Sequence, residues 1–173
     1  MAIIREVNGK EPKFGENCWY AETAVIVGDV EMGNDCTIWY NAVVRGDVNY
    51  IKIGDKTNIQ DGAIIHCTYK RAATEIGSNV SIGHNAIVHG CTLEDNVLIG
   101  MGAIVMDHAV VKSGSIIGAG AIVLQNQVIE PNSIYVGNPA KKVKTVGEEG
   151  IELVTRTANN YVKYASWFKD SSN

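Results

Sequence analysis

A period of six residues constrains this chain more than any other feature of its sequence. Large aliphatic or aromatic residues recur at every sixth position, with short slips of phase between runs. The fourth residue after each of them is usually small or β-branched. This period matches neither the turn of an α-helix nor the two-residue alternation of a flat strand. The runs extend from Phe14 to Val44, Ile53 to Ile65, Ile76 to Val88 and Leu93 to Tyr135.

We interpret each hexapeptide as a short strand and a bend, so that three of them close a triangular coil of eighteen residues. The large residues then fill the interior, and the small ones fit where the wall turns. Glycine often follows the large residue directly, as in Ile53-Gly54, and is expected to supply backbone conformations that other residues resist. Each coil covers the strand edges of the previous one. A sandwich of short strands is the alternative, but it has no reason to keep this phase for so long.

Two interruptions and a distinct tail complete the predicted organisation. The phase breaks at residues 49–52 and again at residues 69–75, where one loose coil or a small loop is expected. Past residue 141 the phase is lost, and apolar residues between Glu148 and Lys169 fall at helical spacing. We therefore predict a β-helix domain over residues 1–145. Residues 146–173 are predicted to form an amphipathic helix and tail that pack on its outside.

Composition and charge exclude several classes of function. A formal net charge of -4 gives no basic footprint for nucleic acid and no basic face for a membrane surface. The chain has no apolar run of transmembrane length, and its first residues lack the apolar core of a signal peptide. The four cysteines form no C-x-x-C pair and are interpreted as small buried residues. The expected location is the cytoplasm.

Three of the four histidines gather in one part of the repeat. His66 and His84 are eighteen residues apart, which is one coil, and His66 and His89 each follow an interior position directly. All three are therefore expected outside the coil, near one corner. One chain makes an awkward cage from them, but two chains make a good one, with two imidazoles from one subunit and a third from its neighbour. Three histidines and a water form a catalytic zinc site, and Co²⁺ or Fe²⁺ also accepts imidazole. His108 is interpreted as a solvated surface residue.

Further polar segments accompany the histidines. Arg45-Gly46-Asp47 follows an interior position one coil before His66, and Asn58 to Gly62 precedes His66 with Asn58 and Gln60 pointing outward. Together with His66 and the later pair His84-x4-His89, these segments resemble the gamma-class carbonic anhydrases of the hexapeptide-repeat family. The resemblance implies an all-β fold, a left-handed parallel β-helix with a C-terminal α-helix alongside. The left hand comes from the resemblance alone, since the general rule for parallel crossovers favours a right-handed coil.

The resemblance also implies an assembly and roles for single residues. It implies a homotrimer with metal sites between subunits, where His66 and His89 come from one chain and His84 comes from the next. Zinc is the expected metal, with Fe²⁺ or Co²⁺ as further possibilities. Arg45 and Asp47 would form an ion pair between subunits or, alternatively, a purely structural bridge. The catalytic set would be completed by Gln60 on the hydroxide or bicarbonate, by Asn58 beside it, and by Tyr161 from the helix, with Tyr164 as the competing tyrosine.

The implied activity is that of a lyase, the reversible hydration of carbon dioxide to bicarbonate. The chain departs from the best-known members of the family where they carry glutamates for proton transfer. Val48 follows Asp47, and Cys67 to Arg71 follow His66 without an acid, so Glu75 is the nearest one. Hydration is therefore expected to be slow or dependent on buffer. Cys67 beside His66 is either an inert buried thiol or a redox sensor.

Other classes of function remain open from the sequence. The segment Gly137-Asn138-Pro139-Ala140-Lys141 also occurs among hexapeptide-repeat acyltransferases, which usually employ one histidine as a base without metal. A trimeric structural protein could retain the metal as an interface staple without hydratase activity. Hydrolysis of an ester or thioester by metal-bound hydroxide is the last alternative. Stoichiometric metal bound by three histidines would argue against the acyltransferase.

Overall fold

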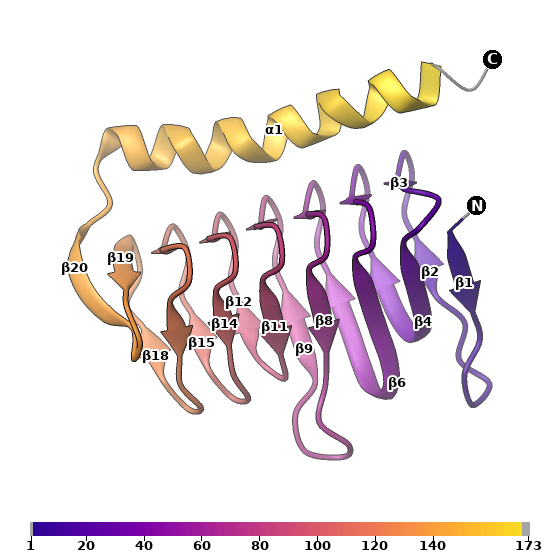
Figure 1. The fold of residues 1–173 in the computed structure, drawn as a ribbon, viewed down its shortest axis with the longest axis horizontal. Coiled ribbons are helices and arrows are strands. Elements are labelled where there is room, and N and C mark those ends of the chain that lie inside the picture. Colours follow the sequence, from indigo (N-terminus) through magenta and orange to yellow (C-terminus); the bar gives the residue numbers. More distant parts are fainter. Residues whose placement is uncertain (1, 171–173) are drawn as a thin grey trace.

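The computed structural model describes residues 2–170 of the chain. The chain winds into a left-handed parallel β-helix of about seven turns, and one helix, α1 (Glu148–Asp170), runs along its side (Figure 1). The predicted fold class is confirmed. The predicted helix from Glu148 to Lys169 is likewise present, with almost the same bounds.

The coil has three faces, each a ladder of short strands stacked along its axis. The first face carries β1 (Ile3–Arg5), β8 (Ile64–His66), β11 (Ile87–His89), β14 (Ile104–Val105), β17 (Ile122–Val123) and the first parts of β4 (Val25–Met32) and β6 (Val43–Ile53). The second face carries the last parts of β4 and β6 together with β2 (Lys13–Phe14), β9 (Thr74–Ile76), β12 (Thr92–Leu93), β15 (Val110–Val111) and β18 (Val128–Ile129).

The third face forms a separate eight-stranded sheet. Its last strand is antiparallel to its neighbour and closes this end of the ladder. The members are β3 (Trp19–Tyr20), β5 (Thr37–Ile38), β7 (Asn58–Ile59), β10 (Ser81–Ile82), β13 (Leu98–Ile99), β16 (Ile116–Ile117), β19 (Ser133–Val136) and β20 (Lys141–Thr145). We name the corner where the third face turns into the first the β10–β11 corner. The β11–β12 corner joins the first face to the second.

The six-residue period describes the interior correctly. Ile65, Val88 and Val105 stack in register on successive coils and are fully buried. The small residues Ala63 and Ala86 are also fully buried, at the turns of the wall. Aliphatic side chains from each coil therefore fill the triangular core. Burial of this apolar surface is the main favourable contribution to the free energy of folding.

The expected role of glycine is wrong at the positions that follow the large residues. There the backbone is not left-handed, and Gly54 is required instead because a Cβ on it would lie 2.7 Å from the carbonyl carbon of Gly77 on the next coil. Left-handed positions are occupied by other glycines and, as often, by asparagine, whose short polar side chain tolerates that conformation. These asparagines include Asn41, Asn79, Asn85, Asn96, Asn126 and Asn132.

The two breaks in phase have different structural origins. Residues 49–52 lie inside β6, which continues around the β11–β12 corner as one long strand. Residues 69–75 include a small loop rather than a loose coil, because Thr68 and Ala72 bridge each other and β9 begins at Thr74. We call residues 67–73 the excursion loop. It leaves the coil immediately after His66.

Helix α1 covers part of the third face, where it contacts β5, β7 and β10. Val154, Ala158 and Ala165 face the coil and are buried. Near its end, the ring of Phe168 lies 5.2 Å from Trp19 and 5.6 Å from Trp39, measured between ring centroids. This aromatic cluster fixes the helix over the face that carries the predicted amides.

The predicted division of the chain falls between two observed elements. β20 ends at Thr145 and α1 begins at Glu148. The division into units of residues 1–145 and 146–173 remains a prediction, and residues 171–173 lie outside the described part. Within residues 2–170, no helix is both long enough and apolar enough to cross a membrane.

Candidate metal centre

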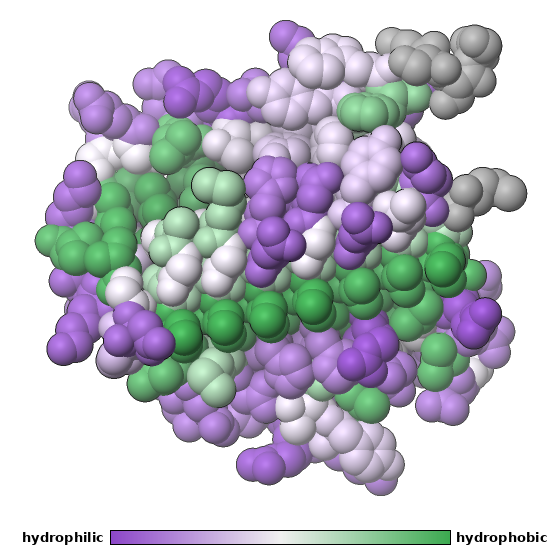
Figure 2. All heavy atoms as spheres, viewed as in Figure 1, coloured by the Kyte–Doolittle hydropathy of each residue, from purple (hydrophilic) through white to green (hydrophobic). Residues whose placement is uncertain are grey.

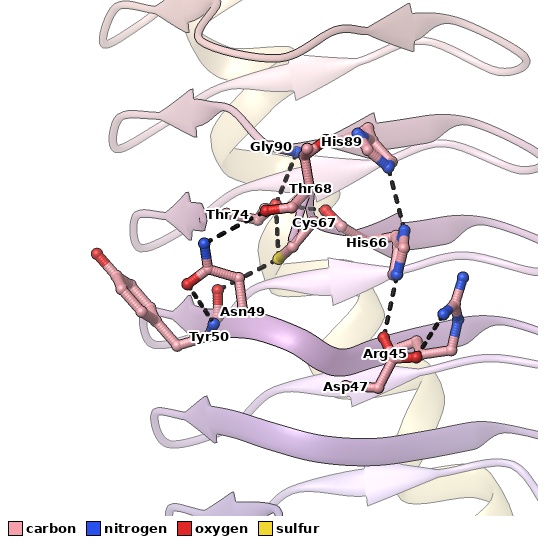
Figure 3. A network of polar contacts seen from close by, with 10 residues as sticks. All are labelled: Arg45, Asp47, Asn49, Tyr50, His66, Cys67, Thr68, Thr74, His89 and Gly90. Atoms are coloured by element: carbon pink, nitrogen blue, oxygen red, sulfur yellow. Dashed lines mark hydrogen bonds and ion pairs between the residues drawn. The ribbon is translucent and has the colours of Figure 1, made fainter. Parts of the chain in front are cut away.

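Two of the predicted ligands lie side by side at the β11–β12 corner. His66 ends β8, and His89 ends β11 directly beside it in register. Nδ1 of His66 lies 3.1 Å from Nε2 of His89, and the ring centroids are 5.0 Å apart (Figure 3). Their position follows from the repeat, because each comes one residue after a buried interior residue. We call this pair the two-histidine half-site.

Asp47 connects the first of these histidines to Arg45. Its Oδ1 lies 3.1 Å from Nε2 of His66, and its Oδ2 accepts a 2.6 Å bond from Nη1 of Arg45 (Figure 3). The predicted ion pair is thus present within one chain, and its role between subunits stays a prediction. Arg45, Asp47 and His66 lie close together because β6, which carries the first two, is the neighbour of β8, which ends at His66.

Asp107 contacts His89 in the same way as Asp47 contacts His66. It lies in the turn after β14, where Oδ1 is 2.6 Å from Nδ1 of His89. Its Oδ2 accepts a 2.6 Å hydrogen bond from the hydroxyl of Thr68 in the excursion loop. On each ring, the nitrogen that points away from the other histidine therefore contacts a carboxylate: Nε2 of His66 contacts Asp47, and Nδ1 of His89 contacts Asp107.

The electrostatics keep both carboxylates ionised. Burial pushes the pKa of Asp47 up, but the hydrogen bonds from Arg45 and His66 outweigh it, so the pKa is lowered. Burial likewise opposes the bonds from Thr68 and His89 at Asp107, whose pKa is also lowered. Burial of the His66 ring lowers its pKa and favours the neutral imidazole. Neutral imidazole is the form that binds metals.

Buried groups behind the rings hold the two strands together. The hydroxyl of Thr74, which is fully buried, donates to the carbonyl of His66 at 2.6 Å and accepts from the amide of Gly90 at 3.0 Å (Figure 3). The thiol of Cys67 is 1% exposed, and burial raises its pKa. A buried protonated thiol favours the interpretation of Cys67 as an inert residue.

His84 lies elsewhere, so the prediction that all three histidines gather at one corner is wrong. It occupies the turn between β10 and β11, at the β10–β11 corner, whereas His89 ends β11. The width of the first face therefore separates them. Nδ1 of His84 lies 2.9 Å from Oδ2 of Asp61, and these side chains are 40% and 41% exposed. We call His84 and Asp61 the one-histidine half-site.

The two predicted amides lie under α1 next to the one-histidine half-site. Asn58 and Gln60 are 1% and 6% exposed, and they flank interior Ile59 on β7. The Gln60 amide donates to Oδ1 of Asn58 at 3.1 Å, and the Asn58 amide donates to the hydroxyl of Ser81 at 2.8 Å. Their outward direction agrees with the prediction, but α1 removes them from bulk solvent.

Of the two competing tyrosines, Tyr161 packs against the wall of the coil. Its ring packs edge-on against Trp39, with centroids 5.2 Å apart. Burial raises the pKa of Tyr161 to about 12, and the nearby carboxylate of Asp61 adds to this shift. The ring contacts of Tyr164 are with Tyr161 and Trp167 on α1 itself.

The donor chemistry of the two-histidine half-site fits a metal. An ionised carboxylate only accepts hydrogen bonds, so each ring turns an N–H toward its carboxylate. A neutral imidazole has one N–H, and the remaining nitrogens of His66 and His89 therefore direct lone pairs at each other across 3.1 Å. A metal ion bound between the two nitrogens would accept both lone pairs, and imidazole nitrogen suits Zn²⁺, Co²⁺ and Fe²⁺.

The single chain does not bring the three predicted ligands together. Among residues 2–170, no group of three or more His, Cys, Asp or Glu side chains is close enough together to hold a metal ion. Each of the three histidines nevertheless has a carboxylate on one ring nitrogen, the arrangement that orients metal-binding imidazoles. The ligands are thus prepared in two separate halves.

Sequence reasoning missed Asp107, Thr68 and Thr74, and it assigned no role to Asp61 within its motif. A signal for Asp107 exists, because it follows His89 by eighteen residues and therefore lies directly above it on the next coil. Thr68 and Thr74 carry no such signal. Their positions depend on the path of the excursion loop, which breaks the period.

Several known proteins are similar in sequence to this chain. Residues 90–125 match the model of the family described as bacterial transferase hexapeptide (six repeats). The chain is 41% identical over 167 residues to a carbonic anhydrase of Geobacillus kaustophilus, covering 96% of this chain and 91% of that protein. It is 39% identical to the mitochondrial gamma carbonic anhydrase 2 of Arabidopsis thaliana over 94% of this chain, but it spans only 60% of the length of that protein.

A solved structure shares the whole fold. The crystal structure of a hexapeptide transferase family protein from Anaplasma phagocytophilum superposes with a TM-score of 0.92 at 37% identity, covering 96% of this chain and 98% of that one. The fold and the identities over nearly full length show that the chain belongs to the gamma carbonic anhydrase family of hexapeptide-repeat proteins.

Proposed function

We propose that the protein catalyses the reversible hydration of carbon dioxide to bicarbonate at zinc sites formed between the subunits of a homotrimer. The observation that carries this proposal is the pairing of each of three histidines with a carboxylate, in two half-sites on adjacent corners of one face. The names of the carbonic anhydrase relatives support the same reaction.

An apolar row on the first face supports assembly through that face. One aliphatic side chain per coil points outward from it, and Figure 2 shows a continuous hydrophobic row there, between more polar surfaces. In the single chain, Ile3 is 52% exposed and Ile64 is 41% exposed. Such a contiguous exposed row is typical of a protein interface. We call it the aliphatic row, and its members are Ile3, Val25, Val43, Ile64, Ile87, Ile104 and Ile122.

The rows of side chains on the two corners support subunits that run in the same direction. The row on the β10–β11 corner is Tyr40, Asp61, His84 and Met101 in successive coils. The row on the β11–β12 corner is Arg45, His66, His89 and Met106. In both rows polar residues give way to methionine at the same height, so parallel copies set His84 beside the two-histidine half-site. Antiparallel copies would set methionine against charge.

The residues would act on the metal and the substrate as follows. When bound, zinc supplies Lewis-acid chemistry that lowers the pKa of water to about 7 and provides hydroxide at neutral pH. His66 and His89 of one subunit and His84 of the next would hold it. Asp47, Asp107 and Asp61 orient the three rings, and the bond from Arg45 keeps Asp47 ionised.

The residues under α1 would bind the substrate and the product. Gln60 and Asn58 present amide groups that suit the oxygens of hydroxide and bicarbonate, and they form part of one bonded network. Tyr161 stays protonated at neutral pH because its pKa is raised by burial, so its hydroxyl can donate to an anion. The helix above them excludes water from this side.

Proton export would be the slow step. Val48 stands where other family members carry a glutamate, and Glu75 is the first acid after His66 along the sequence. The carboxylate of Glu75 accepts a 2.7 Å hydrogen bond from the hydroxyl of Tyr50, so it is already engaged on the second face. We therefore expect hydration that is slow unless a buffer accepts the proton.

The proposed location is the cytoplasm. The cysteines of the chain are free thiols, which suits a reducing compartment. The Arabidopsis relative is named as mitochondrial, so fractionation of cells that express the chain is the measurement that decides between the compartments.

Stopped-flow hydration of carbon dioxide by anaerobically purified, metal-quantified protein tests the activity. The rate should follow metal content, rise with added imidazole, and be lost in His84→Ala but retained in His108→Ala, which changes an exposed histidine. Fully metal-loaded protein that is inactive in either buffer would overturn the hydratase. Transfer of an acetyl group from acetyl-coenzyme A by metal-free protein would favour the acyltransferase instead.

A further inference from the structure

Asp107 and the excursion loop together suggest how the two-histidine half-site is kept ready for a metal. We propose that Asp107 and Thr68 are positioning residues, with Asp107 fixing the ring of His89 and Thr68 fixing the carboxylate of Asp107. This inference rests on the proposed metal site. Neither residue was expected from the sequence motifs.

The contacts of Asp107 determine which nitrogen of His89 is free. Both carboxylate oxygens are engaged at 2.6 Å, one by Nδ1 of His89 and the other by the hydroxyl of Thr68. Hydrogen bonds to an ionised carboxylate are short and strong, so two of them on one group leave it little freedom to rotate. The His89 ring is therefore held as the Nδ1–H tautomer, with the lone pair on Nε2, the nitrogen that faces His66.

The local packing gives the carboxylate space and restricts it. A Cβ on Gly90 would lie 2.5 Å from Oδ1 of Asp107 and 2.8 Å from the Cβ of Ala72. Glycine directly after the predicted ligand His89 thus allows the carboxylate and the excursion loop to approach from two sides. The Asp107 side chain is 22% exposed, so its two bonds are partly shielded from water.

The excursion loop has a function in this arrangement. Thr68 comes two residues after His66, yet its hydroxyl reaches Asp107, which lies two coils further along the axis. A regular coil would carry Thr68 along the second face. Instead, the loop closes on itself through the 2.9 Å bond from the amide of Thr68 to the carbonyl of Ala72. The interruption therefore ties the coil of His66 to the coil above His89.

Metal affinity and the tautomer of His89 distinguish this role from a merely structural one. We would compare the wild-type full chain with Asp107→Asn, Thr68→Val and Thr68→Ser. Asp95→Asn is the matched control, because Asp95 also accepts a hydrogen bond at a turn, from the amide of Ser78 at 2.7 Å, but touches no histidine. Zn²⁺ affinity is measured by chelator competition, and the Co²⁺-loaded proteins are compared by visible absorption. The tautomer is read from ¹⁵N shifts of the metal-free protein, assigned with His89→Gln.

The expected pattern is graded. Asp107→Asn should weaken Zn²⁺ binding by about 10- to 100-fold, change the Co²⁺ spectrum and abolish the preference for Nδ1–H at His89. Thr68→Val should weaken binding by about tenfold, whereas Thr68→Ser, which keeps the hydroxyl, and Asp95→Asn should match wild type. Wild-type affinity, spectrum and tautomer in Asp107→Asn would overturn the inference.

Failure of the proposed function gives a different result. A wild-type protein that binds no Zn²⁺ but retains the Nδ1–H tautomer of His89, with that tautomer lost in Asp107→Asn, would refute the metal site and uphold the positioning of the ring. A metal-binding wild type without hydration activity would refute the hydratase while the affinities of the variants still decide the roles of Asp107 and Thr68.

Discussion

The two half-sites on one face are built to different degrees. At the β11–β12 corner, close polar contacts between side chains run from Arg45 through Asp47, His66, His89 and Asp107 to Thr68. At the β10–β11 corner, His84 has one bond to Asp61, and both side chains are about two-fifths exposed. The first half is organised by the chain itself. The second is exposed, and in the proposed trimer a neighbouring copy would cover it.

This difference has a physical reason. Two imidazoles whose lone pairs converge need fixed backbones and fixed rings, because any loosening would let them turn away from each other. Thr74, Asp47 and Asp107 supply that constraint from buried or partly buried positions. The imidazole of His84, which would join them from another chain, needs only the correct ring orientation. The exposed carboxylate of Asp61 is enough to provide it.

The largest effect is expected from breaking the surface between the half-sites. Ile104→Asp places a charge in the aliphatic row one coil beyond His89, where the proposed interface would bury it unpaired. The variant should run as a single chain of 18.7 kDa in light scattering, while the wild type runs near three times that mass. It should also lose metal, although no ligand has been changed.

Val128→Asp is the matched control for that experiment. Val128 is 55% exposed on the second face, so the same change there should leave assembly intact. An Ile104→Asp protein that still assembles and binds metal would refute the role of the aliphatic row. Loss of assembly in both variants would show that the effect of a new charge is not specific to the first face.

Thr74→Val should destabilise the fold at the two-histidine half-site. It removes one hydroxyl that satisfies both the carbonyl of His66 and the amide of Gly90 in a buried position. Because these two backbone groups also bond each other at 3.1 Å, the variant loses only their bonds to the hydroxyl, which are worth about 0.5–1.5 kcal/mol each. Urea unfolding of the metal-free protein at one protein concentration measures this, with Thr74→Ser and Thr92→Val, which changes a half-buried threonine on β12, as controls that should lose less. Equal losses in all three would remove the special role of Thr74.

Acid unfolding should reveal the bonded state of Asp107. Its pKa is lowered in the folded chain, so its contribution to stability is complete above the unfolded value of about 3.9 and is lost as pH falls through the folded pKa. In Asp107→Asn, the free energy of unfolding of the metal-free chain should therefore depend less on pH below about 4. A slope as steep as that of wild type would contradict the bonds drawn to Asp107.

The smallest effect is expected at the open half-site. Asp61→Asn should change the free energy of unfolding of the metal-free chain by no more than about 0.5 kcal/mol, as is usual for exposed ion pairs. Thermal and urea unfolding measure it beside Thr74→Val. A loss as large as that of Thr74→Val would mean that the one-histidine half-site is also organised by the chain, and the contrast between the two would disappear.

The sequence predicts the coil well because each hexapeptide repeats one physical requirement. An interior of fixed width needs one large residue per face, so Ile65, Val88 and Val105 mark the period by themselves. The positions of His66 and His89 follow from that period. His84 was misplaced because it lies two residues past an interior position rather than one, which moves it into a turn at another corner.

Other parts of the site could not be predicted from a repeat. Thr68 reaches Asp107 only because the excursion loop departs from the period, and a loop path depends on tertiary contacts rather than on spacing. The Arg45–Asp47 bond within one chain needs no repeat, because two residues on the same side of one strand reach each other, and a contact of this pair between chains stays a prediction. Asp107 could have been predicted from the repeat, because it follows His89 by eighteen residues, the length of one coil.

Mixing two inactive variants tests the central claim most directly. His84→Ala retains the two-histidine half-site and His89→Ala retains the one-histidine half-site, so trimers reassembled from both should regain metal and hydration activity at some interfaces. A mixture of His66→Ala and His89→Ala, whose lesions lie in the same half-site, should regain neither. If mixed trimers of the first pair, verified by native mass spectrometry, bind no metal, or if either variant alone keeps full metal occupancy, the site is not divided between subunits.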